Sequence, residues 1–222
     1  NSIKPHISGT PLLGAARGGH VKVAQQLVDA GAPIDGLDLF GGAPLVWAAY
    51  GGHLKMVEFL LEKKADIERR QLFGRVTPLH MACARSHAHV VDALLLRGAK
   101  PSKLHEPGIS CMHIAAVRGD THIIKALLAK GAKPDPLGFL AGTPIMNASQ
   151  SGKVEVVKLL TEAKANPRRT MRFPWFGSTV IGMAAFNGEA AVIELLCKAR
   201  ASPNQTSWYH PGSYMPLQFA AA

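Results

Sequence analysis

The side chains of this sequence that could carry chemistry are ten histidines and three cysteines. His87 and His89 are close enough in sequence to share a metal ion, but no spacing brings further ligands to them. The segment 14–20, GAARGGH, faintly imitates a phosphate-binding loop, yet it lacks the Lys-Ser/Thr pair and follows no predicted strand. No nucleophile, base and orienting acid recur at a spacing typical of catalysis. We therefore expect no catalytic residue, no metal site and no cofactor.

A repeated pattern determines where these side chains fall. It is clearest in 77–102, TPLHMACARSHAHVVDALLLRGAKPS. The copies follow one another at steps of 33, 34, 33, 33, 36 and 36 residues, and they begin at Thr10, Ala43, Thr77, Ser110, Thr143, Thr179 and Met215. The pattern thus predicts repeats at approximately 10–42, 43–76, 77–109, 110–142, 143–178 and 179–214, with a partial repeat at 215–222.

Each repeat predicts two short helices. Thr at the first position favours an N-cap, and the Pro that usually follows suits the first turn of a helix. The first helix carries a pair of small residues that lets a neighbouring helix approach closely: Ala15–Ala16, Ala48–Ala49, Ala82–Cys83, Ala115–Ala116, Ala148–Ser149 and Ala184–Ala185. A turn is then expected at Gly19, Gly52, Ser86, Gly119, Gly152 and Gly188.

The second helix of each repeat is amphipathic. Its apolar residues recur at i, i+1, i+4 and i+5, as in Val90, Val91, Leu94 and Leu95, which predicts one buried face. After this helix a left-handed residue is needed, and the position is held by Gly31, Gly98, Gly131, Lys64, Lys164 and Arg200. The three non-glycine caps should be weaker by roughly 1 kcal/mol each.

The motif Thr77-Pro78-Leu79-His80-x-Ala82, with the turn, the double-leucine second helix and the Gly98-Ala99 ending, resembles the ankyrin repeat. The resemblance covers about 10–222. It implies an all-α repeat solenoid of stacked helix-turn-helix units with short β-hairpin loops. It also implies structural roles for His80 and His113. Four residues depart from the motif and weaken individual caps: Cys111, Val180, Gly182 and Gln218.

We expect 1–222 to form a single ankyrin-repeat domain within a longer chain. A terminal repeat normally presents polar residues outward, yet the first repeat keeps four apolar ones and the last stops within its first helix. The four are Leu12, Leu13, Val21 and Val23. The apolar runs fall far short of the roughly 18 residues that a membrane span requires. Buried thiols at Cys83, Cys111 and Cys197 would suit a reducing, cytoplasmic location.

The resemblance implies that loop tips and the exposed side of the first helices form a concave binding surface. Mapped onto this sequence, the helix contribution is Arg17, Tyr50, Arg85, Arg118, Gln150 and Phe186. The loops are unusually apolar, and their candidate contact residues are Leu39, Phe40, Phe73, Phe139, Leu140, Trp208 and Tyr209. Two interpretations are open: the apolar tips pack against adjacent loops, or they form an exposed patch for a partner, which we favour.

Two loops, 168–178 and 204–214, are three residues longer than the others. The first joins arginines to aromatic residues, namely Arg168, Arg169, Arg172, Phe173, Trp175 and Phe176. Because no helix dipole accounts for these arginines, we expect this loop to contact a partner with apolar anchors and acidic residues.

The net charge is +10, from 25 Lys and Arg against 15 Asp and Glu. Many of the cations follow the second helices, which defines a basic ridge: Lys63, Lys64, Arg97, Lys100, Lys130, Lys133, Lys164, Lys198 and Arg200. Cations there complement the helix dipole by ~0.3–1 kcal/mol each, so a solvated stabilising ridge is the first interpretation. The second is contact with nucleic acid, an anionic membrane surface or an acidic protein.

These patterns favour a non-catalytic scaffold that binds a protein partner. The alternative is a regulatory or targeting ankyrin module of a larger enzyme, channel or multi-subunit complex. Binding of nucleic acid or an anionic membrane surface through the basic ridge ranks third.

Overall fold

The computed structural model describes residues 10–39, 41–71, 75–102, 104–105, 108–138, 142–170 and 179–204. The chain divides into two compact units, Asn1–Glu106 (unit 1) and Pro107–Ala222 (unit 2). A single domain that spans both units remains a prediction. None of the described helices is long and apolar enough to cross a membrane.

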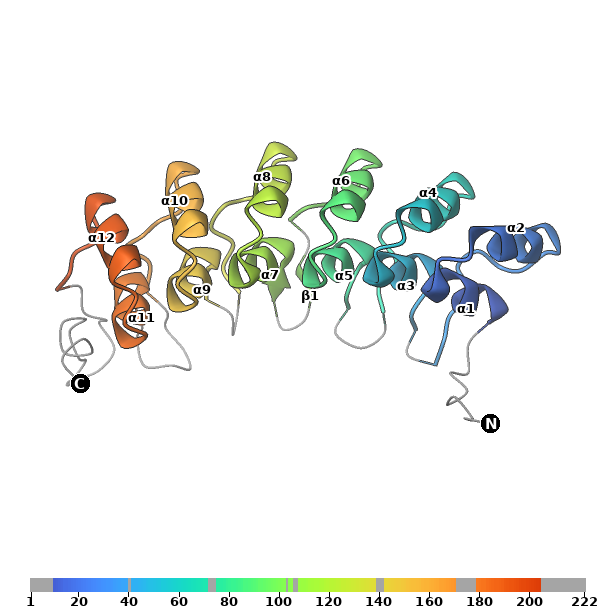
Figure 1. Cartoon of the computed structure of the whole chain (residues 1–222), viewed down its shortest axis with the longest axis horizontal. Helices are drawn as coiled ribbons and strands as arrows, with labels where there is room; N and C mark the ends of the chain where they lie inside the picture. The colour runs from blue at the N-terminus through green and yellow to red at the C-terminus, as the bar shows by residue number, and fades with distance from the viewer. Residues whose placement is uncertain are drawn as a thin grey trace. The chain divides into compact units, whose positions relative to one another are not determined.

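The described part of unit 1 consists of three helix pairs and one short strand. In chain order its described elements are α1 (Pro11–Gly18), α2 (Val21–Asp29), α3 (Pro44–Gly51), α4 (Leu54–Glu62), α5 (Pro78–Ala84), α6 (Ala88–Leu96) and β1 (Leu104–His105). The first helices pack side by side, α1 on α3 and α3 on α5, and the second helices α2, α4 and α6 follow the same order. Figure 1 shows the two rows, with the first helices below the second helices.

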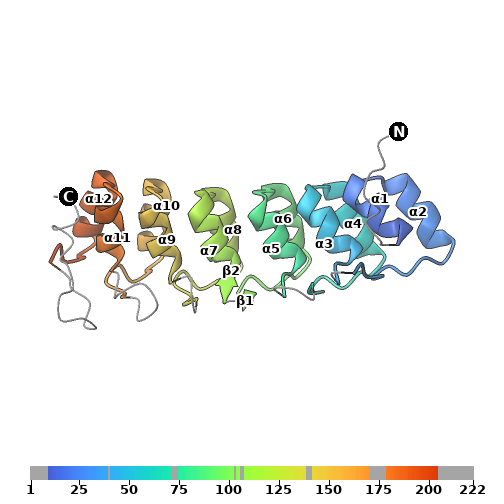
Figure 2. The ribbon, with the colours of Figure 1, turned by 90° about the horizontal axis from the view of Figure 1, so that it is seen from below.

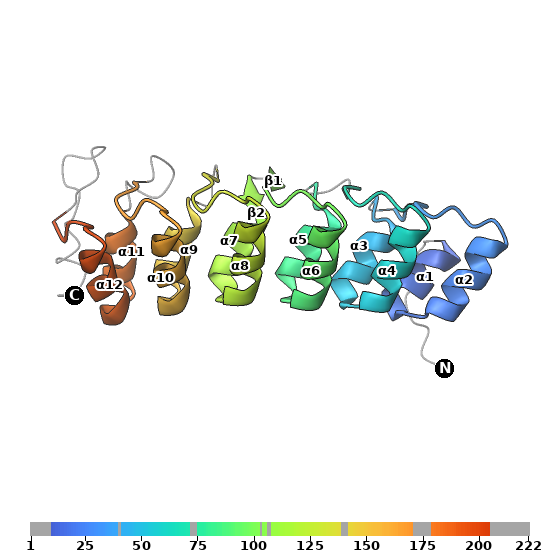
Figure 3. The same cartoon turned by 90° about the horizontal axis from the view of Figure 1, so that it is seen from above.

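Unit 2 repeats this arrangement. Its described elements are β2 (Ile109–Ser110), α7 (Cys111–Arg118), α8 (Thr121–Ala129), α9 (Pro144–Gln150), α10 (Val154–Glu162), α11 (Val180–Phe186) and α12 (Ala190–Lys198). Helix α9 packs between α7 and α11, and α10 packs between α8 and α12. Figures 2 and 3 show that the loops of each unit gather at one end of its helices. Each unit is thus an all-α stack of helix-turn-helix repeats, the architecture of a solenoid.

The caps of the first helices follow the prediction in four repeats. The side chains of Thr77, Ser110, Thr143 and Thr179 accept a hydrogen bond from the backbone N–H three residues later. The Thr10 side chain makes no such bond, and Ala43 has no side chain that could accept one. In both repeats the Pro at the start of the helix is the remaining local feature that favours helix initiation.

The predicted left-handed positions are confirmed. The turn residues Gly19, Gly52, Gly119, Gly152 and Gly188 have positive φ, and so does Ser86, with φ of 58°. After the second helices, Lys64, Lys164 and Arg200 have φ of 64°, 66° and 66°. Since a side chain disfavours this region, these three caps are the weaker ones, as expected.

The core of each unit is formed by the small pairs of the first helices and the stripes of the second helices. Both members of each pair are buried, from Ala15 and Ala16 to Ala184 and Ala185. Val90, Val91, Leu94 and Leu95 of α6 are buried as the stripe predicts. The small pairs allow close approach of neighbouring first helices, whose larger apolar side chains, such as Leu12, Leu45 and Leu79, are buried as well.

Two expectations about burial were wrong. Cys197 is exposed, whereas Cys83 and Cys111 are buried. Cys197 lies at the i+5 position of its stripe, at the margin of the apolar face, where Leu61 and Leu128 are only half-buried. Leu12 and Leu13 do not face outward. They are 0% and 5% exposed, and of the four apolar residues expected on the outside of the first repeat only Val23 is exposed.

Candidate functional site

Only some of the predicted contact residues lie in the described part of the chain: Arg17, Leu39, Tyr50, Arg85, Arg118, Gln150, Arg168, Arg169 and Phe186. The others lie outside the described residues, namely Phe40, Phe73, Phe139, Leu140, Arg172, Phe173, Trp175, Phe176, Trp208 and Tyr209. Their predicted role in partner binding stays a prediction.

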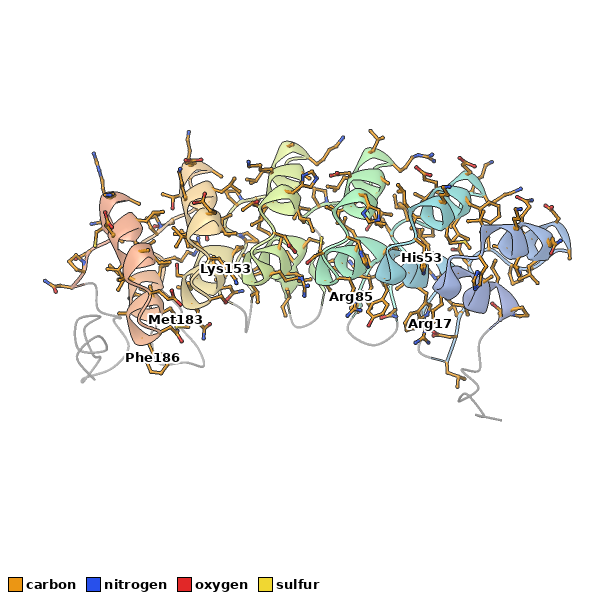
Figure 4. All side chains as sticks on the ribbon, in the orientation of Figure 1. Arg17, His53, Arg85, Lys153, Met183 and Phe186 are labelled. Atoms are coloured by element: carbon orange, nitrogen blue, oxygen red, sulfur yellow. The ribbon has the colours of Figure 1, made fainter. Side chains whose placement is uncertain are left out.

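The first helices of unit 1 bring together two arginines and two aromatic rings. The guanidinium carbon of Arg17 lies 5.0 Å from the centre of the Trp47 ring, and that of Arg85 lies 4.8 Å from the centre of the Tyr50 ring. The two rings meet edge to face, with centroids 5.8 Å apart. These four residues, which we name the unit 1 ladder, come from α1, α3 and the C-terminal end of α5. Figure 4 labels Arg17 and Arg85 beside the row of first helices.

Trp47 is held in the ladder by the loop before its own helix. Its Nε1–H donates a hydrogen bond of 2.8 Å to Oδ2 of Asp38, and the Gly42 N–H donates one of 2.7 Å to Oδ1. A Cβ atom on Gly42 would lie 2.6 Å from Trp47 Nε1 and 2.9 Å from Asp38 Oδ2. The indole therefore occupies space that only glycine leaves open, and Asp38 fixes the orientation of the ring.

Histidines of the following repeats fix the backbone beneath the ladder. The His53 ring donates from Nε2 to the Arg17 carbonyl oxygen at 3.0 Å, and the His87 ring donates to that of Tyr50 at 3.1 Å. A Cβ atom on Gly19 would lie 2.7 Å from the His53 ring. Burial lowers the pKa of His87, and the nearby His89, Arg85 and His53 lower it further, against the hydrogen bond to Tyr50.

Two further histidines have structural roles, as the resemblance implied. The Nδ1 atom of His113 accepts from the Ser110 N–H at 3.2 Å, and its Nε2–H donates to the Gly142 carbonyl oxygen at 3.1 Å. The Thr77 hydroxyl lies 2.8 Å from Nδ1 of His80, which is also buried. Within the described ranges no group of three or more His, Cys, Asp or Glu could hold a metal ion.

Two of the mapped helix residues do not occupy the same repeat position as the others. Arg85 and Arg118 come one residue later in their repeats than Arg17 and Tyr50 do, and the equivalent residues are Ala84 and Val117. Arg85 forms the C-cap of α5 and still reaches Tyr50. Arg118 instead lies 3.6 Å from Asp120, in an ion pair.

Trp47 was missed by the sequence analysis. The predicted helix contacts were chosen at the repeat position of Arg17 and Tyr50. Trp47 lies one helical turn before that position, where the first and third repeats have Gly14 and Met81. The sequence does show one sign of it, because a large aromatic residue stands at a repeat position where other repeats have small or aliphatic residues.

In unit 2 the side of the first helices presents apolar side chains. Phe186 of α11 is 67% exposed and Val117 of α7 is 48% exposed. Met183, one turn before Phe186, is half-buried, and Figure 4 shows both on α11. The loops add Leu37 and Leu39 in unit 1 and Leu137 in unit 2, all three exposed.

Arg169 has a partner within unit 2. Its Nη1 donates to Oδ2 of Asp135 at 3.1 Å, which joins two successive loops. Unit 1 joins its loops through backbone groups: Asp35 accepts from the Asp66 N–H, and Glu68 accepts from the Lys100 N–H at 2.7 Å. Arg169 thus has a structural role, and its predicted contact with a partner stays a prediction.

Every residue of the basic ridge is exposed. Two of its members have local partners: Lys63 lies 5.8 Å from the centre of the Phe59 ring, and Lys198 forms an ion pair with Glu194 at 2.6 Å. Contact of the ridge with an acidic partner stays a prediction.

Comparisons with known proteins agree with this fold. A model of ankyrin repeats in three copies matches residues 112–207, and a model of ankyrin repeats in many copies matches 12–61 and 45–95. The crystal structure of the human ASB11 ankyrin repeat domain is similar to this chain with a TM-score of 0.83 and 28% sequence identity. The similarity covers 95% of this chain and 91% of that one. No curated protein matches the chain.

Proposed function

Because the chain belongs to the ankyrin-repeat family, whose members are generally protein–protein interaction modules, we propose that it is a non-catalytic scaffold that binds a protein partner. The partner contacts the first helices and the loops beside them. We call this side of a unit its contact face. In unit 1 it is defined by Arg17, Trp47, Tyr50, Arg85, Leu37 and Leu39, and in unit 2 by Val117, Phe186 and Leu137.

The observation that carries the proposal is where the exposed large hydrophobic residues lie. Five of the seven found among the described residues belong to the contact face: Leu37, Leu39, Val117, Leu137 and Phe186. The other two, Val23 and Leu96, lie on second helices. Within each unit, exposed apolar side chains on the first helices and on the loops are of the kind that marks interaction sites. The predicted loop aromatics outside the described residues, Trp175 among them, would extend this face.

None of the three cysteines in the described residues forms a disulfide. Reduced thiols suit a reducing compartment, so the proposal includes action in the cytoplasm.

The test uses a partner captured by the full chain from cell extract and compares its retention by single variants. Phe186→Ser and Leu39→Ser remove apolar side chains of the contact face. Leu96→Ser is the matched control, because Leu96 is 75% exposed but lies on the second helix α6. We expect both contact-face variants to weaken retention at least about fivefold and the control to leave it unchanged, since truncation of an apolar anchor costs roughly 1 kcal/mol or more. Retention that depends on Leu96 and ignores Phe186 and Leu39 would place the partner elsewhere and refute the proposal.

A further inference from the structure

The unit 1 ladder carries two arginines that form no ion pair among the described residues. The three first helices α1, α3 and α5 contain no Asp or Glu. Both arginines are exposed. The ladder is therefore a local cationic site that faces solvent.

The carboxylates of the adjoining loops are already engaged. Asp38 accepts from Trp47 and from the Gly42 backbone. Asp35 and Glu68 accept backbone N–H groups of the following loops. None of these carboxylates forms an ion pair with Arg17 or Arg85, so both guanidinium groups remain available to a partner.

The rings hold the two arginines in a defined orientation. A guanidinium stacked on an aromatic ring keeps the N–H groups of its plane free, and this planar fork suits a carboxylate. Trp47 cannot swing away, because Asp38 holds its Nε1–H and Gly42 leaves room only for the indole. The cost of ordering two long side chains is thereby largely met before a partner binds.

The same stacking argues against nucleic acid as the occupant. Binding of single strands relies on bases that stack on open aromatic faces. Trp47 and Tyr50 are half-buried, each has a guanidinium over its ring, and their remaining contact is with each other. The ladder offers positive charge at its two ends and a covered aromatic surface between them.

The spacing of the charges sets the kind of ligand. The contacts of 5.0, 5.8 and 4.8 Å link the two guanidinium groups through the ring centres, so the groups are at most about 16 Å apart. An extended peptide advances roughly 3.3–3.6 Å per residue, so about four or five residues cover this span. Two acidic side chains separated by up to that distance could each meet one arginine.

We propose that the unit 1 ladder binds an extended peptide segment with two acidic residues, one opposite Arg17 and one opposite Arg85. This inference rests on the proposed function and names the chemistry of the partner at one part of the contact face.

The experiment selects random linear peptides, displayed on phage, for binding to the full chain. We expect the selected peptides to be enriched in pairs of Asp or Glu separated by three to five positions, and their affinity to fall as salt is raised. The chain with both Arg17→Gln and Arg85→Gln should bind them at least about tenfold more weakly, which corresponds to ~1.4 kcal/mol. The chain with Lys63→Gln is the matched control, since it loses a cation–π contact of unit 1 on a second helix, and its affinity should change less than twofold.

Should the double variant fold poorly, replacing both acids of a selected peptide by Gln tests the same contacts against the unchanged chain, with the same tenfold loss expected. Selected peptides without acidic pairs, equal binding to the double variant, or no selected peptide at all would overturn the inference. So would an oligonucleotide that binds the ladder more tightly than every selected peptide. The capture experiment with Phe186→Ser and Leu39→Ser alters no ladder residue, so it reports separately on whether the contact face binds protein.

Discussion

Gly42 determines whether Trp47 can occupy the ladder. Replacing it by Ala places a Cβ atom within 3 Å of both Trp47 Nε1 and Asp38 Oδ2, so the indole or the loop must move. We expect Gly42→Ala to lower the free energy of unfolding by ~1–3 kcal/mol, as overpacking typically does, and to weaken binding of the selected acidic peptides. Denaturant titration and fluorescence anisotropy measure the two effects.

The matched control for this change is Gly14→Ala. Gly14 lies inside α1, and a Cβ atom there would meet no other atom within 4 Å. Since Ala is the better helix former, this change should raise stability by up to about 1 kcal/mol and leave peptide binding unchanged. A Gly42→Ala chain as stable as the Gly14→Ala chain would mean that Trp47 is not held as described.

His87 should make unit 1 sensitive to acid. Its pKa in the folded chain is lowered, chiefly by burial, below the value of about 6.5 that the unfolded chain has. The unfolded state therefore binds more protons in this range, so stability is complete above pH ~6.5 and is lost as pH falls toward the folded pKa. Compared with His87→Gln, the wild-type chain should lose stability between pH 7 and pH 5, as followed by urea titration at each pH. Parallel curves for the two chains over this range would contradict the assignment.

At the scale of the helix, the apolar stripe of α6 separates residues that stabilise the stack from residues that do not. Leu94 is fully buried, whereas Leu96, two residues later, is 75% exposed. Leu94→Ala should cost about 2–5 kcal/mol, because it removes buried methyl groups and leaves a cavity. Leu96→Ala should change stability by less than about 0.5 kcal/mol. Chemical denaturation of both variants checks the difference, and a loss below ~1 kcal/mol at Leu94 would show that the predicted register of the stripe is wrong.

The elements were predictable because their signals are local. Pro after the cap, the small pair, the turn residue and the i, i+1, i+4, i+5 stripe each act within one helix or turn. They correctly predicted the N-cap at Thr77, the turn at Ser86 and the buried stripe of α6. Cys197 was mispredicted because its burial depends on how far the neighbouring packing reaches, which the period does not encode. Trp47 was missed because its contacts come from Asp38 in a loop and Arg17 in another repeat.

At the scale of the whole chain, the period predicts how many helix pairs follow one another but not how they group. The boundary between the units falls between Glu106 and Pro107, in a loop where the step between repeats is an ordinary 33 residues. Stacking in repeat proteins is a nearest-neighbour property, so each interface depends on the particular residues of two repeats. The two units also differ in chemistry, since arginines and aromatic rings occupy the contact face of unit 1, whereas Val117 and Phe186 make that of unit 2 apolar.

In two repeats the turn histidine contacts the turn glycine of the preceding repeat. These contacts restrict how such a chain can evolve by duplication. The His53 and His87 rings fill the spaces that Gly19 and Gly52 leave, whereas Lys153 has that place beside Gly119. A duplicated repeat inserted elsewhere would bring its own turn residue against a new neighbour. Recombination preserves this contact only if the turn glycine of one repeat stays together with the turn side chain of the next repeat. The unit that can be exchanged without losing the contact therefore runs from the middle of one repeat to the middle of the next.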